Sequence, residues 1–86
     1  MNKKITVKTQ IGDIRYCIID FNQDVDNQLA QVHGHDGNHG ISARLTDTQI
    51  LVVDYFHDSL MGAHDILAIE DTDAPVSLKW NTVTQE

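Results

Sequence analysis

Apolar and polar residues alternate along much of this chain, with the two-residue period of half-buried β-strands. Near the N-terminus, Ile5–Gln10 and Asp13–Phe21 predict two strands joined by a hairpin turn around Ile11-Gly12. With that turn, Lys8 and Arg15 share one face of the hairpin. The pairs that oppose each other on the other face are Ile5 with Ile18, Val7 with Tyr16, and Thr9 with Ile14.

Four further segments have strand-like patterns, and these are Ile41–Leu45, Ile50–Phe56, Ile66–Glu70 and Val76–Val83. The second of them begins with a continuous apolar run, which is typical of a strand inside its sheet. His57–Asp65 predicts a break with one helical turn capped by Asp58, and Asp71–Pro75 predicts a turn. In the last segment Val76, Leu78 and Trp80 share one face, and Ser77, Lys79 and Asn81 share the other. Short strands with short connections predict a mainly β fold, a small antiparallel barrel or sandwich of about six strands.

Residues 24–40, between the N-terminal hairpin and the later strand-like segments, have two interpretations. In the first, Asp36-Gly37 forms a hairpin turn that places His33 and His35 side by side on a solvent-exposed face. In the second, residues 24–33 form a short helix, because Val25, Leu29 and Val32 make an apolar stripe; Asp24 and Asp26 suit its start and Gly34 its end. The pattern leaves both interpretations open.

The run Ile5-Thr6-Val7-Lys8-Thr9, followed by Gly12, resembles the opening hairpin of the ubiquitin family. The resemblance covers about eight residues, and the chain ends Thr84-Gln85-Glu86 where that family has Gly-Gly. It implies an alternative fold, a β-grasp-like α+β domain with one helix at 24–33. It implies nothing about function.

Length and composition indicate one small globular domain over residues 1–86, with a single modest core. The longest apolar runs, such as Ile50–Val53, have about four residues, too few to span a membrane or to form a secretory signal core. The lone Cys17 cannot form an internal disulfide and is expected to be a small packed residue. We therefore expect a cytoplasmic protein, in the host cytoplasm if it is phage-encoded.

The formal net charge is −7, and it is unevenly distributed. Residues 1–19 hold four basic residues against one acid, whereas residues 20–86 hold two basic residues against twelve acids. Such a body repels nucleic acid and anionic membranes and favours a basic protein partner. Acidity also serves to keep small domains soluble.

Protein binding is the function that these features favour. Acidic side chains around partly exposed aromatic residues would anchor a basic partner. The candidate binding residues are Asp20, Asp24, Asp26, Tyr55, Phe56, Asp65, Glu70, Asp71 and Asp73. The sharper hypothesis is an inhibitor or nucleic-acid-mimicking decoy of a nucleic-acid-handling protein. Small phage proteins that block host defence nucleases often have this size and charge, although no residue motif is matched.

Metal binding is a second hypothesis, because three of the five histidines lie between His33 and Gly40. His33, His35 and His39 are the candidate ligands, and imidazole suits zinc or nickel. The spacing matches no established metal motif, so no cofactor is expected and a metal-responsive domain stays an alternative. A small subunit that self-associates through a sheet edge is a further alternative.

The sequence contains only fragments of catalytic motifs. His35-Asp36, His57-Asp58 and His64-Asp65 are neighbours in the chain, and Ser59 follows the second pair. Sequence neighbours rarely orient each other as a catalytic triad requires, because that geometry is set in space. We therefore expect a protein that is not an enzyme.

Overall fold

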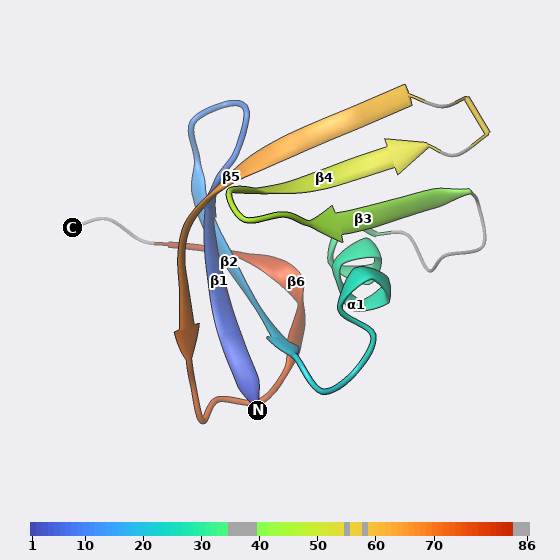
Figure 1. Cartoon of the computed structure of the whole chain (residues 1–86). Helices are drawn as coiled ribbons and strands as arrows, with labels where there is room; N and C mark the ends of the chain where they lie inside the picture. Colours follow the sequence, from blue (N-terminus) through green and yellow to red (C-terminus); the bar gives the residue numbers. More distant parts are fainter. Residues whose placement is uncertain (35–39, 55, 58, 84–86) are drawn as a thin grey trace.

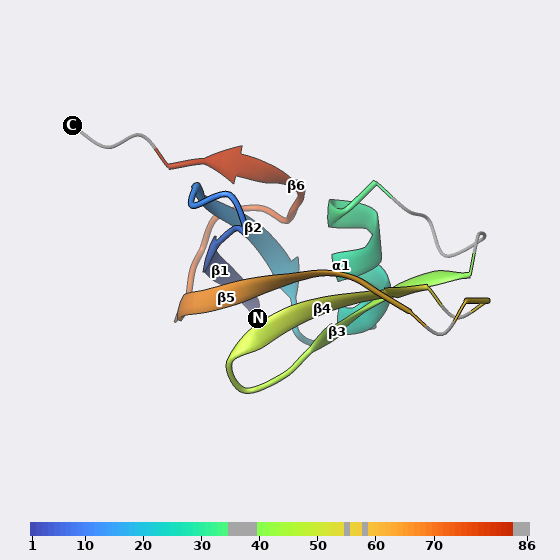
Figure 2. The ribbon, with the colours of Figure 1, turned by 90° about the horizontal axis from the view of Figure 1, so that it is seen from above.

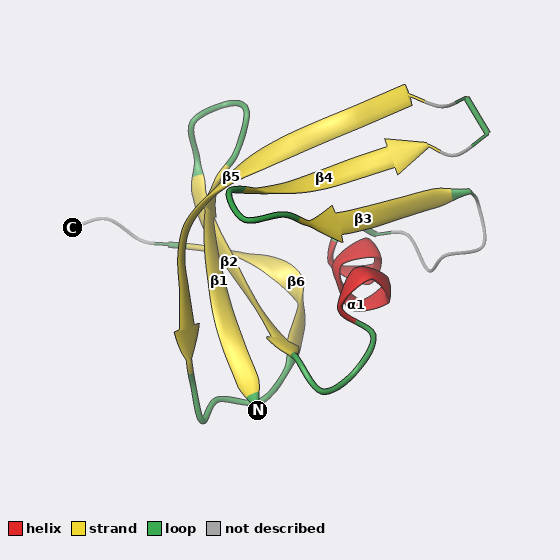
Figure 3. Ribbon diagram, in the orientation of Figure 1, coloured by secondary structure: helices red, strands yellow, loops and turns green. Residues whose placement is uncertain are grey.

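A computed structural model describes residues 1–34, 40–54, 56–57 and 59–83 (Figure 1). Within these ranges the chain forms six strands and one helix, coloured by type in Figure 3. In chain order they are β1 (Asn2–Lys8), β2 (Ile14–Asp20), α1 (Val25–Val32), β3 (Ile41–Leu45), β4 (Gln49–Asp54), β5 (Ser59–Asp71) and β6 (Ser77–Thr82). The predicted mainly β, antiparallel architecture is confirmed.

The strands form one sheet in the order β3-β4-β5-β1-β2-β6, and each described pair is antiparallel. The sheet curls into a half-barrel, and α1 lies on its open side, where it packs on β2, β3 and β6 (Figure 2). The pairing register of β5 shifts against both β1 and β4. Such bulges increase strand bending, which lets the thirteen-residue β5 cross both halves of the sheet.

The register of the first hairpin differs by one residue from the predicted pairs. Ile5 lies opposite Cys17, not Ile18, and Val7 lies opposite Arg15, not Tyr16. The cause is a three-residue turn in place of the expected two-residue turn.

In this turn the backbone N–H of Thr9 donates to the Asp13 carbonyl at 2.8 Å, and Gly12 has the positive φ of 92° that closes such a loop. Since side chains alternate along a strand, the one-residue change reverses the two faces of β2. Arg15 therefore lies on the concave face with Cys17, not beside Lys8 on the other face.

The helical interpretation of residues 24–33 is confirmed. The Asp24 carboxylate caps α1 by accepting the backbone N–H of Asn27 at 3.1 Å, and Gly34 follows the helix with a φ of 84°. The hairpin interpretation is wrong for His33, which ends the helix and is half-buried. The predicted turn at 36–37 lies outside the described residues.

The predicted break at His57–Asp65 is wrong over most of its length, because β5 begins at Ser59. Ser59 and Leu60 pair with β4 opposite Asp54 and Val53. The pairing of β5 with β1 begins only at Asp65. The side chains of residues 59–61 are therefore exposed, those of residues 62–64 are half-buried, and this part of β5 shows no clear alternation. Pairing with a neighbouring strand here overrides the local turn signals.

The core fills the concave side of the sheet beneath α1. Its largest fully buried members are Ile5, Val7, Cys17, Ile19, Leu29 and Ile50. Leu78 and Trp80 of β6 pack against it, whereas Val76, which the alternation placed on the same face, precedes β6 and is exposed. Burial raises the pKa of the Cys17 thiol to about 12, so this cysteine is a packed, unreactive residue. Among the described residues, no helix has the length and apolarity needed to cross a membrane.

Candidate functional site

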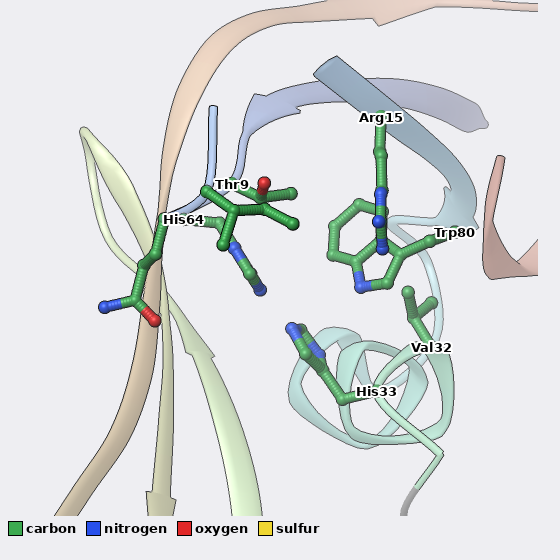
Figure 4. Close-up of a pocket in the computed structure, with 8 residues that line it drawn as sticks. Thr9, Arg15, Val32, His33, His64 and Trp80 are labelled. Carbon is green, nitrogen blue, oxygen red and sulfur yellow. The ribbon is translucent and has the colours of Figure 1, made fainter. Parts of the chain in front are cut away.

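A cavity of about 340 Å³ opens where the β1–β2 turn, β5, β6 and the end of α1 come together (Figure 4). We call it the histidine cavity, and its lining residues are Thr9, Gln10, Ile11, Arg15, Val32, His33, His64 and Trp80. None of these is a carboxylate, although the chain as a whole is strongly acidic.

His33 enters the cavity from the last turn of α1. Its Nδ1 lies 2.8 Å from the Leu29 carbonyl, which can only accept, so Nδ1 carries the proton of this hydrogen bond. In the neutral ring the lone pair is then on Nε2. The capping position of His33 thus fixes both the orientation and the tautomer of the imidazole.

His64 enters from the opposite side, on β5, while its neighbour Asp65 faces outward and accepts from Gln49 Nε2 at 3.1 Å. The Nδ1 atom of His64 is buried and has no hydrogen-bond partner within the described part of the chain. Burial lowers the pKa of His64, and the positive charge of Arg15 lowers it further, against a smaller opposing effect of Asp65. The neutral imidazole is therefore favoured at this position.

Three aromatic rings form the wall of the cavity. The rings of His33 and His64 have centroids 5.1 Å apart and planes inclined by 12°. The Trp80 indole stands edge-on to both, at 5.3 Å from His33 and 5.5 Å from His64. In Figure 4 the two imidazoles point toward each other, and the indole nitrogen of Trp80 faces the space beside them.

Arg15 supplies the charge in this site. Its Nη2 lies 2.9 Å from Asp13 Oδ2, and its side chain extends from β2 toward Trp80 (Figure 4). A guanidinium has five N–H donors, and this ion pair engages Nη2 alone. Donors, positive charge and aromatic walls make the cavity suited to a small anion.

The acidic candidates gather elsewhere, at the end of the sheet that carries the N-terminus (Figure 1). Asn2 pairs with Asp20 and Lys3 with Asp71, so the ends of β2 and β5 flank the start of β1. Gln28 Nε2 donates to the carbonyls of both Asp20 and Asp24, which attaches the start of α1 to the same place. We call this group the acidic end, and it consists of Asp20, Asp24, Asp26, Glu70, Asp71 and Asp73.

Some of these carboxylates have partners within the fold. Asp20 lies 3.5 Å from the N-terminal amino group, Asp71 lies 3.3 Å from Lys3 Nζ, and Asp24 caps α1. Asp26, Glu70 and Asp73 are exposed and make no ion pair with another described residue.

The remaining binding candidates are not part of this group. Asp65 lies opposite Lys8, at the other end of β1. Phe56 is 80% exposed in the β4–β5 connection, at the opposite end of β5 from Asp71. Tyr55 lies outside the described residues.

Of the predicted metal ligands, only His33 is within the described residues, and His35 and His39 are not. The described part of the chain contains no group of three or more His, Cys, Asp or Glu side chains placed to hold a metal ion. His33 lies beside His64, a residue that the metal hypothesis did not include.

The chain neighbours His64 and Asp65 point to opposite faces of β5 and do not form a catalytic pair. His57 instead bonds to Asp54, with Nδ1 2.8 Å from Oδ2, and this bond lowers the pKa of the Asp54 carboxyl. The other two neighbour pairs include Asp36 and Asp58, which lie outside the described residues.

Sequence reasoning missed three members of the histidine cavity: Arg15, His64 and Trp80. Only the correct hairpin register could have placed Arg15 on the concave face.

Comparison of this chain with protein-family models, curated proteins and solved structures finds no match.

Proposed function

We propose that this protein is a non-catalytic binding module that docks its acidic end on a basic surface of a partner protein. The observation that carries the proposal is the convergence of six carboxylates, from the ends of β2 and β5 and the start of α1, around the first residues of β1. Two lysines and the N-terminal amino group offset part of this charge. The excess is negative, and it attracts a cationic surface.

Apolar side chains beside the carboxylates support a protein partner. Ile69 is 40% exposed and precedes Glu70 and Asp71, and Val76 is 42% exposed after the loop that holds Asp73. Protein interfaces combine apolar contacts with a charged rim that sets orientation and association rate. The acidic end has both components.

A hollow of about 300 Å³ between α1 and β3 supplies a more specific contact. Asp24, Asp26 and Asn27 line one side of it, and Ser42 lines the other. The carboxylates favour a cation, and the hollow has room for the end of a Lys or Arg side chain from the partner.

The finer proposal concerns the identity of the partner. Surfaces that bind nucleic acid are basic because they neutralise phosphates. The carboxylates of the acidic end would take the positions of the phosphates on such a surface, and the protein would act as a decoy. The protein would then inhibit a nucleic-acid-handling protein in the cytoplasm, in the host cytoplasm if it is phage-encoded.

Comparative affinity capture from source lysate tests this function, with nuclease treatment to remove partners bridged by nucleic acid. The D26N/D73N variant removes two charges from the acidic end, and the D47N/D65N variant removes two charges elsewhere. A partner retained by the wild type and by D47N/D65N, but lost by D26N/D73N, supports the proposal. A partner retained equally by all three forms contradicts it.

A further inference from the structure

The histidine cavity lies at the opposite end of β1 from the acidic end and differs from it in charge, because its lining holds no carboxylate and its one cation, Arg15, is paired with Asp13 outside the lining. β1 has seven residues, so the two sites are separated by about 20 Å. The acidic end presents six carboxylates, whereas the cavity lining presents Arg15, two imidazoles and no carboxylate. A cationic partner at one end therefore does not explain the other end.

Hydrogen-bonding groups in the cavity point to a ligand. Buried polar atoms in folded proteins almost always have a hydrogen-bond partner. His64 Nδ1 is buried without one among the described residues. The Trp80 indole N–H is not a buried atom, and it makes no hydrogen bond to any described residue, so it is available to a ligand. The Arg15 side chain lies beside the Trp80 indole, and the His64 imidazole lies across the cavity from it (Figure 4).

The shape of the cavity restricts what can bind. Its volume of about 340 Å³ lies near the lower end of the range of about 300–1,000 Å³ that is usual for ligand sites. Aromatic rings form its wall, and Val32 and Ile11 add apolar surface. A single guanidinium with apolar walls fits one negative charge on a flat apolar body better than it fits a multiply charged phosphate.

We propose that the histidine cavity binds a small aromatic carboxylate. The carboxylate accepts hydrogen bonds from Arg15 and His64, and the flat body of the ligand packs against the aromatic wall formed with Trp80. His33 is a positioning residue, because its bond to the Leu29 carbonyl holds its ring against His64 and Trp80 in the same aromatic wall.

The intrinsic fluorescence of Trp80 reports directly on this site, because the chain contains one tryptophan. The experiment titrates the purified protein with benzoate, with the neutral analogue benzamide, and with inorganic phosphate, and it maps the site by ¹H–¹⁵N correlation spectra. We expect saturable benzoate binding with a Kd of about 1 mM or below. Benzamide should bind about tenfold more weakly or not at all, because it lacks the charge.

Two variants complete the test. R15Q removes the cavity charge and should weaken benzoate binding about tenfold or more. The matched control R44Q removes a positive charge from β3 and should leave the affinity within about twofold. Spectral changes should map to Thr9–Ile11, Val32, His33, His64 and Trp80.

Three results would overturn the proposal. The first is equal affinity for benzamide and benzoate. The second is an equal effect of R15Q and R44Q on the affinity for benzoate. The third is a saturable fluorescence response to phosphate, or to stoichiometric Zn²⁺, with no response to benzoate. If R15Q does not fold, the comparison of benzoate with benzamide on the wild-type chain still decides. No partner protein is used, so failure here is distinct from failure of the proposed function.

Discussion

The side-chain amide of Gln28 bonds to both backbone groups of Asp20. Its Oε1 accepts the Asp20 N–H at 2.9 Å, and its Nε2 donates to the Asp20 carbonyl at 2.8 Å. Gln28 is only 7% exposed, so these bonds lie away from water. A helix side chain thus takes the place of a neighbouring strand at the end of β2, and it attaches α1 to the sheet.

Replacement of this amide should destabilise the fold. Q28A leaves the backbone N–H of Asp20 without its partner, whereas the Asp20 carbonyl still accepts the backbone N–H of Gln23 at 3.1 Å. One unsatisfied buried group costs about 1–3 kcal/mol. We expect a loss of about 1–3 kcal/mol in the free energy of unfolding, measured by urea denaturation. N27A, at the exposed neighbouring position, should change the stability by about 0.5 kcal/mol or less. Equal losses in the two variants would remove this role from Gln28.

Gly40 and Gly34 provide a matched pair for a second prediction. Both have positive φ, 72° and 84°, which costs an alanine about 1–2 kcal/mol. A Cβ at Gly34 meets open space, but a Cβ at Gly40 would overlap the Phe56 ring. G40A should therefore lower the unfolding free energy by about 1 kcal/mol more than G34A does. Addition of F56A should abolish that excess, and an excess that persists would contradict the steric explanation.

The environment of His64 makes stability depend on pH. The pKa of His64 is lower in the fold than its ordinary value of 6.5, so the unfolded chain binds this proton more readily. Its contribution to stability is complete above pH 6.5 and is lost as the pH falls through the pKa of the folded state. Arg15, His33 and Asp65 are the charged or titratable groups around it.

Urea midpoints at pH 7.5 and pH 5.5 measure this effect. The wild type should be less stable at pH 5.5, and H64Q should show a smaller difference between the two values. An unchanged difference in H64Q would assign the pH dependence to other groups.

Cys17 should resist modification in the folded protein. Its thiol is fully buried and its pKa is raised to about 12, so almost no thiolate forms at pH 8. A chromogenic disulfide reagent should react only in denaturant, with a rate in native buffer that follows global unfolding. Rapid reaction in native buffer would contradict the described packing.

The sequence predicted the fold class because alternation and the apolar stripe of residues 25–32 are local signals. It missed the hairpin register, since the Thr9–Asp13 turn takes one residue more than the expected turn. It also missed the start of β5, because Ser59–His64 are strand residues only through pairing with β4. Where the partner strand decides, local pattern is a poor guide.

The acidic end could largely be predicted from the sequence, whereas the histidine cavity could not. Most of the predicted acidic residues converge because they sit at strand ends that antiparallel pairing brings together. The histidine cavity depends on the reversed face of Arg15 and on a contact between His33 and His64, which are far apart in the chain. No local pattern encodes either relationship.

The salt dependence of binding to a captured partner is the sharpest test of whether the acidic end attracts that partner through its charge. The Kd of the wild type, D26N/D73N and D47N/D65N would be measured between 50 and about 300 mM salt, where screening of exposed charges increases steeply. Wild-type affinity should fall about tenfold or more across this range, because salt screens the attraction between the carboxylates and the partner. At low salt, D26N/D73N should bind the partner more weakly than the wild type, and its affinity should change less with salt concentration. The affinity of D47N/D65N should match that of the wild type across the range. An affinity that is independent of salt, or equal slopes in all three forms, would contradict a protein that acts through its acidic end.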